Sequence, residues 1–430
     1  MNVPELYDRY MITSMVGGFE PVVVDRAAGC TYTAADGKEY LDCFAGIAVT
    51  NAGHGHPKVL AAAKRQIDEL VHCCTYVYYS PRAAEMCKAL AEITPGRLTK
   101  SFLANSGAEA IEGAIRLAKQ HTQRRELIAL THSFHGRTYA TLSITGNWAR
   151  KKGAGPYMPG VAFAPAPYPY RCPFGSTTPE ECAARSAEQI EAVLRYQTCG
   201  DVAAFIAEPV LGEGGIIVPP LNYFRLVKEI LDAHGILFLC DEVQSGFGRT
   251  GKLFAIEHYG VEPDIMCMAK GIADGFPLSA FIATDEIAGA FTPGDHLSTF
   301  GGSPVSCAAG LANIEVMREE DLPGKAAAAG ERIMARLRAF QETCGLIGEV
   351  RGLGLMIGVE LVSDRKAKTP AAAQAKQVRQ LARENGVLFG VGGTFGNVVR
   401  IQPPLVITDA EADRACDVLE RAITDAAETV

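Results

Sequence analysis

Short apolar segments alternate with amphipathic segments along the middle of this chain, and this alternation restricts the possible fold more than any other sequence feature. Helical periodicity marks the longer segments, such as Gly107–Gln120 and Asn222–His234. A strand–helix alternation predicts an α/β fold with a mostly parallel sheet covered by helices on both faces. The segments of strand length are Lys100–Ala104, Glu126–Leu130, Val202–Ala207, Leu237–Cys240, Ile265–Met268 and Ser279–Ala283.

The length of the chain indicates more than one domain, because 430 residues exceed what one ordinary hydrophobic core accommodates. We expect residues 56–320 to form a large domain around the predicted sheet. Residues 1–55, with strands near Cys30–Thr33 and Glu39–Asp42, are expected to join residues 321–430 in a smaller α+β domain. Its other predicted elements are the helices Lys325–Glu342, Ala371–Asn385 and Asp409–Ala427 and the strands Leu355–Leu361, Val387–Leu388 and Val398–Ile401.

Two of the predicted strands deliver an ionisable side chain at their C-terminal end. Asp241 follows Leu237–Cys240, and Lys270 follows Ile265–Met268 after one alanine. Because the carboxyl ends of neighbouring parallel strands face one crevice, we expect the two side chains to meet there. Such a pair suits a pyridoxal phosphate site, where lysine holds the cofactor aldehyde and aspartate keeps the pyridine nitrogen protonated. Taken alone, the two residues also fit a surface lysine and a capping aspartate.

Further residues at the same sheet edge suit the binding of a flat, anionic molecule. Ser106 and Gly107 stand between a strand and a helix, where free amides attract phosphate, although an ordinary helix cap has the same pattern. Phe134, followed by His135, suits stacking on a heteroaromatic ring, and a core phenylalanine is the alternative. Arg137 offers a planar fork for a carboxylate.

Charged residues follow two other predicted strands. Glu208 and Glu213 come after Val202–Ala207, and Arg400 lies in Val398–Ile401 of the smaller domain. Their sequence positions would bring anionic and cationic groups to the same crevice. Solvated surface charge is the alternative that each of these residues leaves open.

The composition argues against several classes of partner. With 41 basic and 49 acidic residues, the formal charge of −8 provides no basic stripe for nucleic acid and no polybasic membrane patch. No segment approaches the roughly 20 apolar residues of a membrane span, and the N-terminus lacks a signal-peptide pattern. We therefore expect a cytoplasmic protein with small-molecule partners. Thirteen scattered cysteines indicate reduced thiols, and the cluster around Cys73 lacks metal-ligand spacing, so we expect no metal site.

One glycine motif requires a separate test. Gly246–Gly251 matches the G-x-G-x-x-G pattern of dinucleotide-binding proteins. In those proteins the motif follows its strand directly and an acidic residue lies about 20 residues further on. Here Asp241–Ser245 intervenes and Gly271 occupies the expected acidic position. The sequence therefore does not support a dehydrogenase.

Seven motifs occur in an order that resembles the class III aminotransferases, which are fold type I pyridoxal phosphate enzymes. The resemblance extends from about residue 20 to about residue 425. It implies pyridoxal 5'-phosphate as cofactor and a large domain with a mostly parallel seven-stranded sheet beside a smaller α+β domain. The motifs are Asn105-Ser-Gly-Ala-Glu-Ala110, Phe134-His-Gly136, Glu208-Pro209, Gly212-Glu-Gly-Gly215, Asp241-Glu-Val-Gln-Ser-Gly-Phe-Gly-Arg-Thr-Gly251, Ala269-Lys-Gly271 and Thr299-Phe-Gly-Gly302.

The resemblance also implies roles for individual residues. Lys270 would be the Schiff-base lysine and proton carrier, and Asp241 the partner of the pyridine nitrogen. Thr299 would reach the phosphate from the neighbouring subunit, which implies a homodimer with shared active sites and leaves a tetramer open. The contact of Glu208 is not assigned. The remaining cofactor contacts would be Gln244 at the ring hydroxyl, Ser106 and Gly107 at the phosphate, Phe134 and Val243 on the two ring faces, and His135.

Within the family, Ile47, Arg137, Glu213 and Arg400 resemble the substrate-binding set of 4-aminobutyrate aminotransferases. Arg137 would hold the distal carboxylate of an ω-amino acid. Arg400 would bind the α-carboxylate of a keto acid, such as 2-oxoglutarate or pyruvate, and Glu213 would neutralise it in the other half-reaction. The resemblance thus implies a ping-pong aminotransferase that uses an ω-amino acid donor.

Two C-terminal segments leave the substrate open. Residues 359–370 and 392–404 are more similar to alanine–glyoxylate aminotransferases of the same class. A decarboxylase or racemase of the same fold is a further alternative. A binding protein without catalysis is disfavoured because both Lys270 and Asp241 are present.

Overall fold

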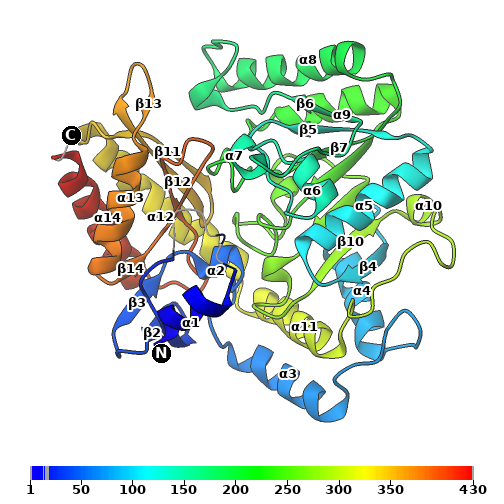
Figure 1. Ribbon diagram of the computed structural model, residues 1–430, viewed down its shortest axis with the longest axis horizontal. Coiled ribbons are helices and arrows are strands. Elements are labelled where there is room, and N and C mark those ends of the chain that lie inside the picture. Colours follow the sequence, from blue (N-terminus) through cyan, green and yellow to red (C-terminus); the bar gives the residue numbers. More distant parts are fainter. Residues whose placement is uncertain (1, 13, 15–18, 429–430) are drawn as a thin grey trace.

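The structure is a computed structural model that describes residues 2–12, 14 and 19–428. Its centre is a seven-stranded sheet in which β10 alone runs antiparallel to its neighbours. The expected mostly parallel sheet is thus present (Figure 1). In spatial order its strands are β4 (Lys100–Ala104), β10 (Ser279–Ala283), β9 (Ile265–Met268), β8 (Leu237–Asp241), β7 (Val202–Ala207), β5 (Glu126–Leu130) and β6 (Val161–Ala164).

Helices cover both faces of the central sheet, as the alternation in the sequence predicts. On one face α5 (Gly107–Thr122) packs Ile111 and Ala114 against the strands. On the other face α9 (Tyr223–His234) packs against β8, where the rings of Phe224 and Phe238 stack with centroids 5.5 Å apart. Beside it lies α8 (Pro179–Gln197), which contacts β6. Burial on both faces explains why these strands are continuously apolar rather than alternating.

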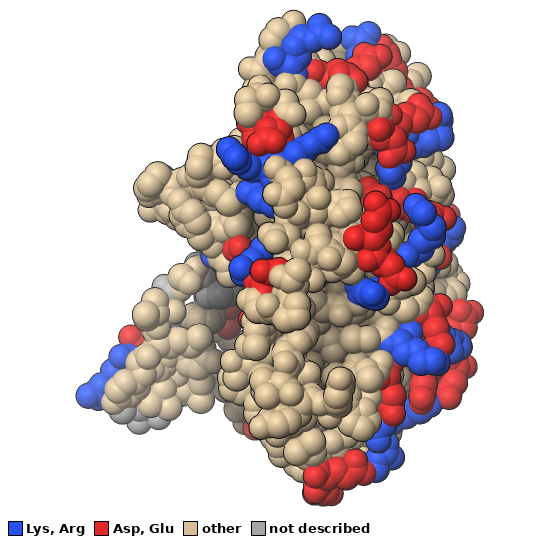
Figure 2. Space-filling view, turned by 90° about the vertical axis from the view of Figure 1, so that its right-hand side faces the viewer, with Lys and Arg blue, Asp and Glu red and all other residues tan. Residues whose placement is uncertain are grey.

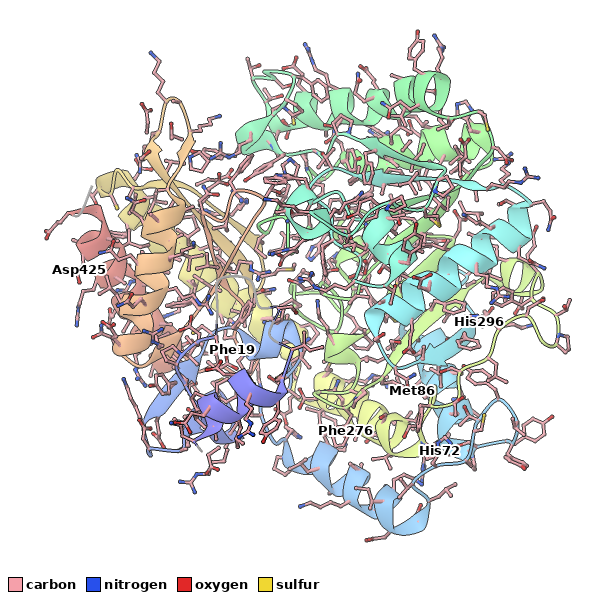
Figure 3. The ribbon with its side chains drawn as sticks, viewed as in Figure 1. Phe19, His72, Met86, Phe276, His296 and Asp425 are labelled. Carbon is pink, nitrogen blue, oxygen red and sulfur yellow. The ribbon has the colours of Figure 1, made fainter. Side chains whose placement is uncertain are left out.

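Three further helices pack together in the lower part of the molecule as seen in Figure 1. They are α3 (Pro57–Glu69), α4 (Pro81–Ile93) and α11 (Pro304–Glu319), and α11 contacts both of the others. Figure 3 shows Met86 of α4 in the interior, where a Cβ added to Gly310 of α11 would come within 3.2 Å of its sulfur. The absence of a side chain at Gly310 therefore allows this close helix contact.

The N-terminal and C-terminal parts of the chain pack together beside the large sheet. β3 (Glu39–Asp42) pairs in parallel with β14 (Val387–Leu388) and thereby joins segments that are far apart in sequence. The first and last helices lie on this side of the molecule (Figure 1). We propose that residues 1–55 and 321–430 form one small domain and residues 56–320 the large one, a division that this pairing supports.

The small part of the structure contains two sheets besides its helices, within the described residues. One has the order β1-β2-β3-β14 and the other β11-β12-β16-β15. The strands β11 and β15 and the large-sheet strand β6 are absent from the sequence-based expectation. The elements not yet given are α1 (Val3–Tyr10), α2 (Ala45–Ala48), α6 (Tyr139–Ser143), α7 (Trp148–Lys151), α10 (Asp285–Ala288), α12 (Leu322–Thr343), α13 (Ala372–Glu384), α14 (Asp409–Ala427), β1 (Val24–Ala28), β2 (Thr31–Ala34), β11 (Ile347–Leu353), β12 (Met356–Asp364), β13 (Thr369–Pro370), β15 (Gly390–Gly392) and β16 (Val398–Ile401).

The arginine inside the G-x-G-x-x-G segment is completely buried. The Arg249 guanidinium donates to the carbonyls of Leu355 and Pro403 and to the Asn51 side chain, so it joins the N-terminal, central and C-terminal parts of the chain. The segment continues into turns and a short 3-10 helix at Ala255–His258 rather than opening an α-helix. Its role is therefore structural, in agreement with the rejection of a dinucleotide site.

Replacement of Arg249 by methionine should destabilise the protein strongly. The substitution leaves two buried carbonyls and the Asn51 oxygen without their donor, which we expect to cost about 2–4 kcal/mol of unfolding free energy. Denaturant unfolding followed by circular dichroism measures this change. The matched control is Arg332→Met, at an exposed ion pair with Asp413, which should change the midpoint little. Equal stability of the two variants would contradict the prediction.

Candidate active site

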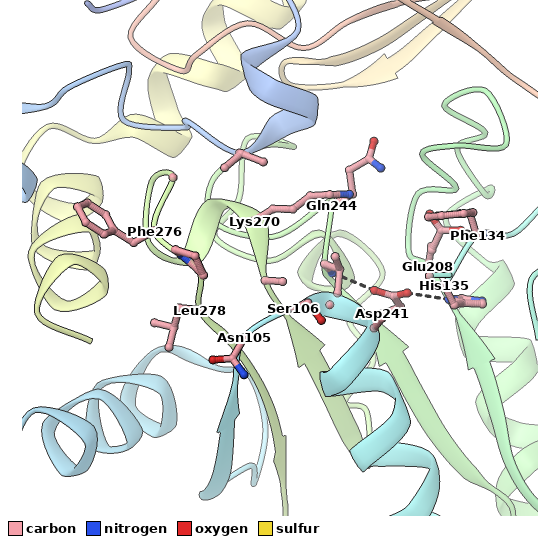
Figure 4. A pocket seen from close by; sticks show the side chains of 18 residues that line it. Asn105, Ser106, Phe134, His135, Glu208, Asp241, Gln244, Lys270, Phe276 and Leu278 are labelled. Atoms are coloured by element: carbon pink, nitrogen blue, oxygen red, sulfur yellow. Dashed lines mark hydrogen bonds and ion pairs between the residues drawn. The ribbon is translucent and has the colours of Figure 1, made fainter. Parts of the chain in front are cut away.

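A cavity of about 340 Å³ lies at the carboxyl ends of the parallel strands of the central sheet. Lys270 and Asp241 both line it, so the two ionisable residues at neighbouring strand ends share one site (Figure 4). The other lining residues are Val49, Asn105, Ser106, Gly107, Ala108, Phe134, His135, Gly136, Glu208, Val243, Gln244, Ala269, Gly275, Phe276, Pro277 and Leu278.

Lys270 is held in a strained backbone conformation, with one residue between it and the end of β9. Its φ of 49° lies in the left-handed region, which is costly for a residue with a side chain and is common at functional sites. Asn313 of α11 supports the turn by donating to the carbonyl of Gly271 over 2.8 Å. Burial lowers the pKa of the Lys270 amine, although the negative charges of Asp241 and Glu208 oppose this shift.

Asp241 forms a buried hydrogen bond with His135. Its Oδ2 lies 2.7 Å from His135 Nδ1, and its Oδ1 accepts from the backbone N–H of Val243 over 3.0 Å. Burial by itself would lower the pKa of His135, but the hydrogen bond to Asp241 and the charges of Asp241 and Glu208 raise it overall. The second ring nitrogen of His135 is buried without a hydrogen-bond partner in the described chain.

Glu208 links two loops at the edge of the cavity. Its carboxylate accepts from the backbone N–H of Phe134 through one oxygen and from that of Gly212 through the other, each over 2.9 Å. Burial raises the pKa of Glu208 above its ordinary value. The contact that the sequence left unassigned is therefore a clamp on two backbone segments, which fixes the loop carrying Phe134.

The N-terminus of α5 forms another part of the cavity wall. The Ser106 hydroxyl caps the helix by accepting from Glu109 N over 3.2 Å, and the first amides of a helix have no partner within it. Gly107 packs against Val243, since a Cβ added there would lie 2.8 Å from its side chain. Ser106 is thus both an ordinary cap and a cavity residue, and the open helix terminus suits an anion.

An ion-pair cluster connects the loop after β7 with β16 of the small sheet. Arg400 donates to Oε2 of Glu213 over 3.2 Å, and Arg150 of α7 donates to Oε1 through Nε over 2.8 Å. Burial would raise the pKa of Glu213, but Arg400 and Arg150 outweigh it and hold this pKa below its usual value. The charges of Arg400 and Glu213 also act on the pKa of Lys270, Arg400 lowering it and Glu213 raising it.

Five of the residues expected from the sequence do not line the cavity of this single chain. Two of them, Glu213 and Arg400, form the ion-pair cluster described above. Thr299 is exposed, and Ile47 is 44% exposed in α2 with a positive φ. Arg137 is exposed as well, with its guanidinium 5.6 Å from the centre of the Phe134 ring. The structure therefore brings the expected cofactor contacts other than Thr299 into one site, whereas Thr299 and the four expected substrate residues lie outside its lining.

Two residues that contact the predicted site residues were not predicted from the sequence. Gln402, just after β16, donates to the side chain of Gln244 over 3.0 Å. Arg150 holds Glu213. Gln402 lies two positions after Arg400, so strand periodicity could have placed it on the same face. No local signal marks Arg150, because only the tertiary fold brings α7 to this loop.

Comparison with known proteins identifies the family to which this chain belongs. A model of the aminotransferase class-III family matches residues 14–423, so this chain belongs to the class III aminotransferases. Members of this family depend on pyridoxal 5'-phosphate, which confirms the expected cofactor and enzyme class. An amine transaminase from an uncultivated Pseudomonas species, solved in its cofactor-bound form, has a TM-score of 0.91, 33% identity and coverage of 97% of this chain and 98% of its own. The expected fold type is therefore confirmed.

Curated relatives with similar identity have different activities. The chain is 43% identical to an acetylornithine aminotransferase of Methanothermobacter thermautotrophicus, covering 94% of this chain and 95% of that protein. It is 42% identical to a leucine/methionine racemase of Thermococcus litoralis, with 99% and 96% covered. It is 40% identical to a 5-aminovalerate aminotransferase of Pseudomonas putida, with 96% of both covered. Overall similarity thus gives the family and not the substrate.

The three histidines that precede Cys73 in the sequence each have a different partner. His54 lies 2.8 Å from Asp42, His56 lies 3.0 Å from Glu320, and the ring of His72 packs on Phe300. Among the residues that the structure describes, no group of three or more His, Cys, Asp or Glu side chains is arranged to hold a metal ion. Within the same part of the chain, no helix has the length and apolarity needed to cross a bilayer.

The bond between His135 and Asp241 should give a defined pH dependence of stability. Because the pKa of His135 is raised above 6.5 in the folded protein, this stabilisation is complete at low pH and is lost as pH rises through the folded pKa. We expect His135→Asn to lower the unfolding free energy of the cofactor-free protein by about 1–3 kcal/mol at pH 6 and by less at pH 9.

Thermal unfolding between pH 6 and pH 9 measures this difference. The control is His234→Asn, since His234 forms only an exposed pair with Glu191. That variant should follow wild type across the range. A His135→Asn deficit that grew with pH would have the wrong sign and would contradict the assigned bond.

Proposed function

We propose that this enzyme transfers the amino group of an ω-amino acid, such as 4-aminobutyrate, to an α-keto acid by a ping-pong mechanism. The observation that supports this choice best is the ion pair between Glu213 and Arg400, whose charges both act on Lys270. An ω-amino acid has no carboxylate next to its amino carbon, so Arg400 would be a buried, unpaired cation without Glu213. A keto acid supplies its own carboxylate and replaces Glu213.

The side chains around the cavity fit pyridoxal 5'-phosphate. Ser106, Gly107 and the open N-terminus of α5 suit the phosphate, and Phe134 and Val243 line the space where a ring would lie between them. Gln244 lines the cavity at the position that we assign to the ring hydroxyl. When bound, the cofactor supplies an aldehyde for Lys270 and an electron-accepting ring that stabilises negative charge at the amino carbon of the substrate.

In this proposal Lys270 and Asp241 carry the chemistry of the protein itself. The lowered pKa of Lys270 suits an amine that accepts a proton at Nζ from the substrate carbon and returns it. The Asp241 carboxylate would accept a hydrogen bond from the protonated ring nitrogen of the bound cofactor. His135 orients that carboxylate through the 2.7 Å hydrogen bond. Glu208 acts at a distance by fixing the backbone of Phe134.

Two arginines provide the proposed contacts to substrate carboxylates. Arg400 suits the α-carboxylate of the keto acid, and Arg137, next to the Phe134 ring, suits the distal carboxylate of the ω-amino acid. Ile47 is proposed to pack against the aliphatic part of the substrate. The curated 5-aminovalerate aminotransferase relative, at 40% identity, supports a donor whose amino group is remote from its carboxylate.

We further propose that the active unit is a homodimer. Exposed apolar side chains gather on the segments 71–79 and 297–300, including Val77, Tyr78, Tyr79 and Phe300. These segments contact each other, since the ring of His72 packs against that of Phe300 with centroids 5.2 Å apart. Figure 2 shows a broad area without charged side chains on the side of the molecule that carries these two segments. A second copy would cover this surface and bring its Thr299 to the phosphate end of the cavity.

Replacement of Lys270 by alanine should abolish turnover. The variant loses the attachment point and the proton carrier, so we expect the steady-state rate to fall by at least a factor of roughly 10⁴. Loss of the characteristic cofactor absorbance of the lysine adduct should accompany it. The control is Lys252→Ala, because Lys252 does not line the cavity and its amine donates to the carbonyl of Glu257. Unchanged turnover in Lys270→Ala would exclude the mechanism.

Replacement of Arg137 by alanine tests the donor. If Arg137 holds the distal carboxylate, the KM for 4-aminobutyrate should rise roughly 10- to 100-fold, while that for alanine should change little. Arg125→Ala is the matched control, since Arg125 lies 89% exposed at the opposite end of β5. Equal effects on alanine and 4-aminobutyrate would contradict the proposed role.

A donor panel decides the function as a whole. Purified enzyme is offered 4-aminobutyrate, 5-aminovalerate, N-acetylornithine and alanine, each with 2-oxoglutarate or pyruvate, and the initial rates of amino transfer are compared. The proposal expects the highest kcat/KM with an ω-amino acid. Preference for alanine, or racemisation of an amino acid without use of a keto acid, would overturn it.

A further inference from the structure

Glu213 is bound by two arginines at once, and the two contacts differ. Arg150 reaches one carboxylate oxygen through both Nε, at 2.8 Å, and Nη2, whereas Arg400 reaches the other oxygen through a single nitrogen at 3.2 Å. All three side chains are largely buried, at 13% exposed for Arg150 and Glu213 and 6% for Arg400. Glu213 is therefore held more closely by Arg150 than by the arginine that it neutralises.

Arg400 retains a free donor in this arrangement. Its Nε is buried without a hydrogen-bond partner in the described chain, and its guanidinium lies 5.0 Å from the centre of the Phe44 ring. A Cβ at Gly392 would come within 3.0 Å of that nitrogen, so the backbone closes one side of the guanidinium. An incoming carboxylate that binds Arg400 through both terminal nitrogens would have to displace Glu213 from Nη1.

The backbone around Glu213 is fixed from several sides. The Glu213 carbonyl accepts from Gly393 N over 3.2 Å, and Arg351 donates to the carbonyls of Gly215 and Ile216 over 2.6 and 2.9 Å. Arg351 is itself buried and paired with Glu360 at 2.7 Å. Glu213 can therefore leave Arg400 by rotation of its side chain, without movement of its loop.

The helix that carries Arg150 is also fixed. Asn147 caps α7 by accepting from Ala149 N over 3.2 Å, and its own N–H donates to the carbonyl of Ser133 over 3.1 Å. Gly146 packs so closely on the end of β5 that a Cβ there would lie 2.1 Å from the Leu130 carbonyl oxygen. Arg150 thus extends from a rigid support toward a carboxylate that rests on a rigid loop.

We propose that Arg150 is a positioning residue that retains the Glu213 carboxylate when a substrate α-carboxylate replaces it on Arg400. Without Arg150, Glu213 would become an unpaired buried anion next to a second anion, and both effects disfavour binding of the keto acid. With Arg150, the exchange breaks one hydrogen bond and leaves Glu213 neutralised. Arg150 thereby favours substrates that carry an α-carboxylate and is neutral toward those that do not.

This inference rests on the proposed exchange of Glu213 and substrate on Arg400, and it makes a one-sided prediction. Arg150→Met should raise the KM for 2-oxoglutarate roughly 10- to 100-fold, the range expected when a partly buried carboxylate loses a charged partner. The half-reaction with 4-aminobutyrate, in which Glu213 remains on Arg400, should change less than about threefold. Stopped-flow absorbance of the cofactor-loaded enzyme measures each half-reaction separately.

A double-mutant cycle isolates the contact. In Glu213→Gln there is no anion to retain, so adding Arg150→Met should leave the KM for 2-oxoglutarate unchanged. Arg150→Lys, which keeps a positive charge without the fork, should give an intermediate KM. Calorimetric titration with glutarate, which lacks the reacting keto group, should give the same ratio of Kd values without any turnover.

Three results would overturn the inference. They are an unchanged KM for 2-oxoglutarate in Arg150→Met, equal losses with 2-oxoglutarate and 4-aminobutyrate, and an Arg150→Met effect that persists in the Glu213→Gln background. Failure of the proposed function gives a different pattern. If wild type prefers alanine, Arg150→Met weakens both half-reactions, because both substrates carry an α-carboxylate, and Glu213→Gln still cancels the effect.

Discussion

The structure depends on the burial of charge at the carboxyl edge of the central sheet. Asp241, Glu208 and His135 are each less than 5% exposed there, and a buried charge is tolerated only when partners compensate for lost water. Asp241 has His135 and one backbone amide, and Glu208 has two amides. The loops around the cavity are therefore fixed by the charges that they enclose, so the arrangement that tunes Lys270 also stabilises its surroundings.

Much of this edge could be predicted because its signals are local. Continuous apolar segments mark β4, β5, β7 and β9 with the bounds that the structure has, and polarity at their ends marks the cavity. Asp241 and Lys270 follow neighbouring strands, and because these strands are parallel, both side chains lie at the same edge of the sheet. Two strands, β6 and β11, were not predicted, and each has its own physical reason. β6 is four residues long at the sheet edge, and β11 contains two charged residues and two glycines that weaken its strand pattern.

Contacts that join distant parts of the chain could not be predicted from the sequence. Arg249 appears as an element of a glycine motif, and only the fold shows that it holds Leu355 and Pro403 in place. The clamp formed by Glu208 depends on two loops meeting, and Arg150 depends on a four-residue helix placed by the end of β5. Thr299 is a different case, because a single chain leaves it exposed and its proposed place requires a second copy.

The specificity of such an enzyme follows from what is rigid and what moves. Both the loop of Glu213 and the helix of Arg150 are held by backbone hydrogen bonds, so the carboxylate of Glu213 is the smallest group whose displacement changes the charge presented by Arg400. A side-chain rotation costs far less than a loop movement, and in the proposed exchange a permanent partner on its other oxygen keeps the displaced anion from becoming a buried unpaired charge. Under this proposal one pocket accepts substrates with and without an α-carboxylate while its walls remain in place.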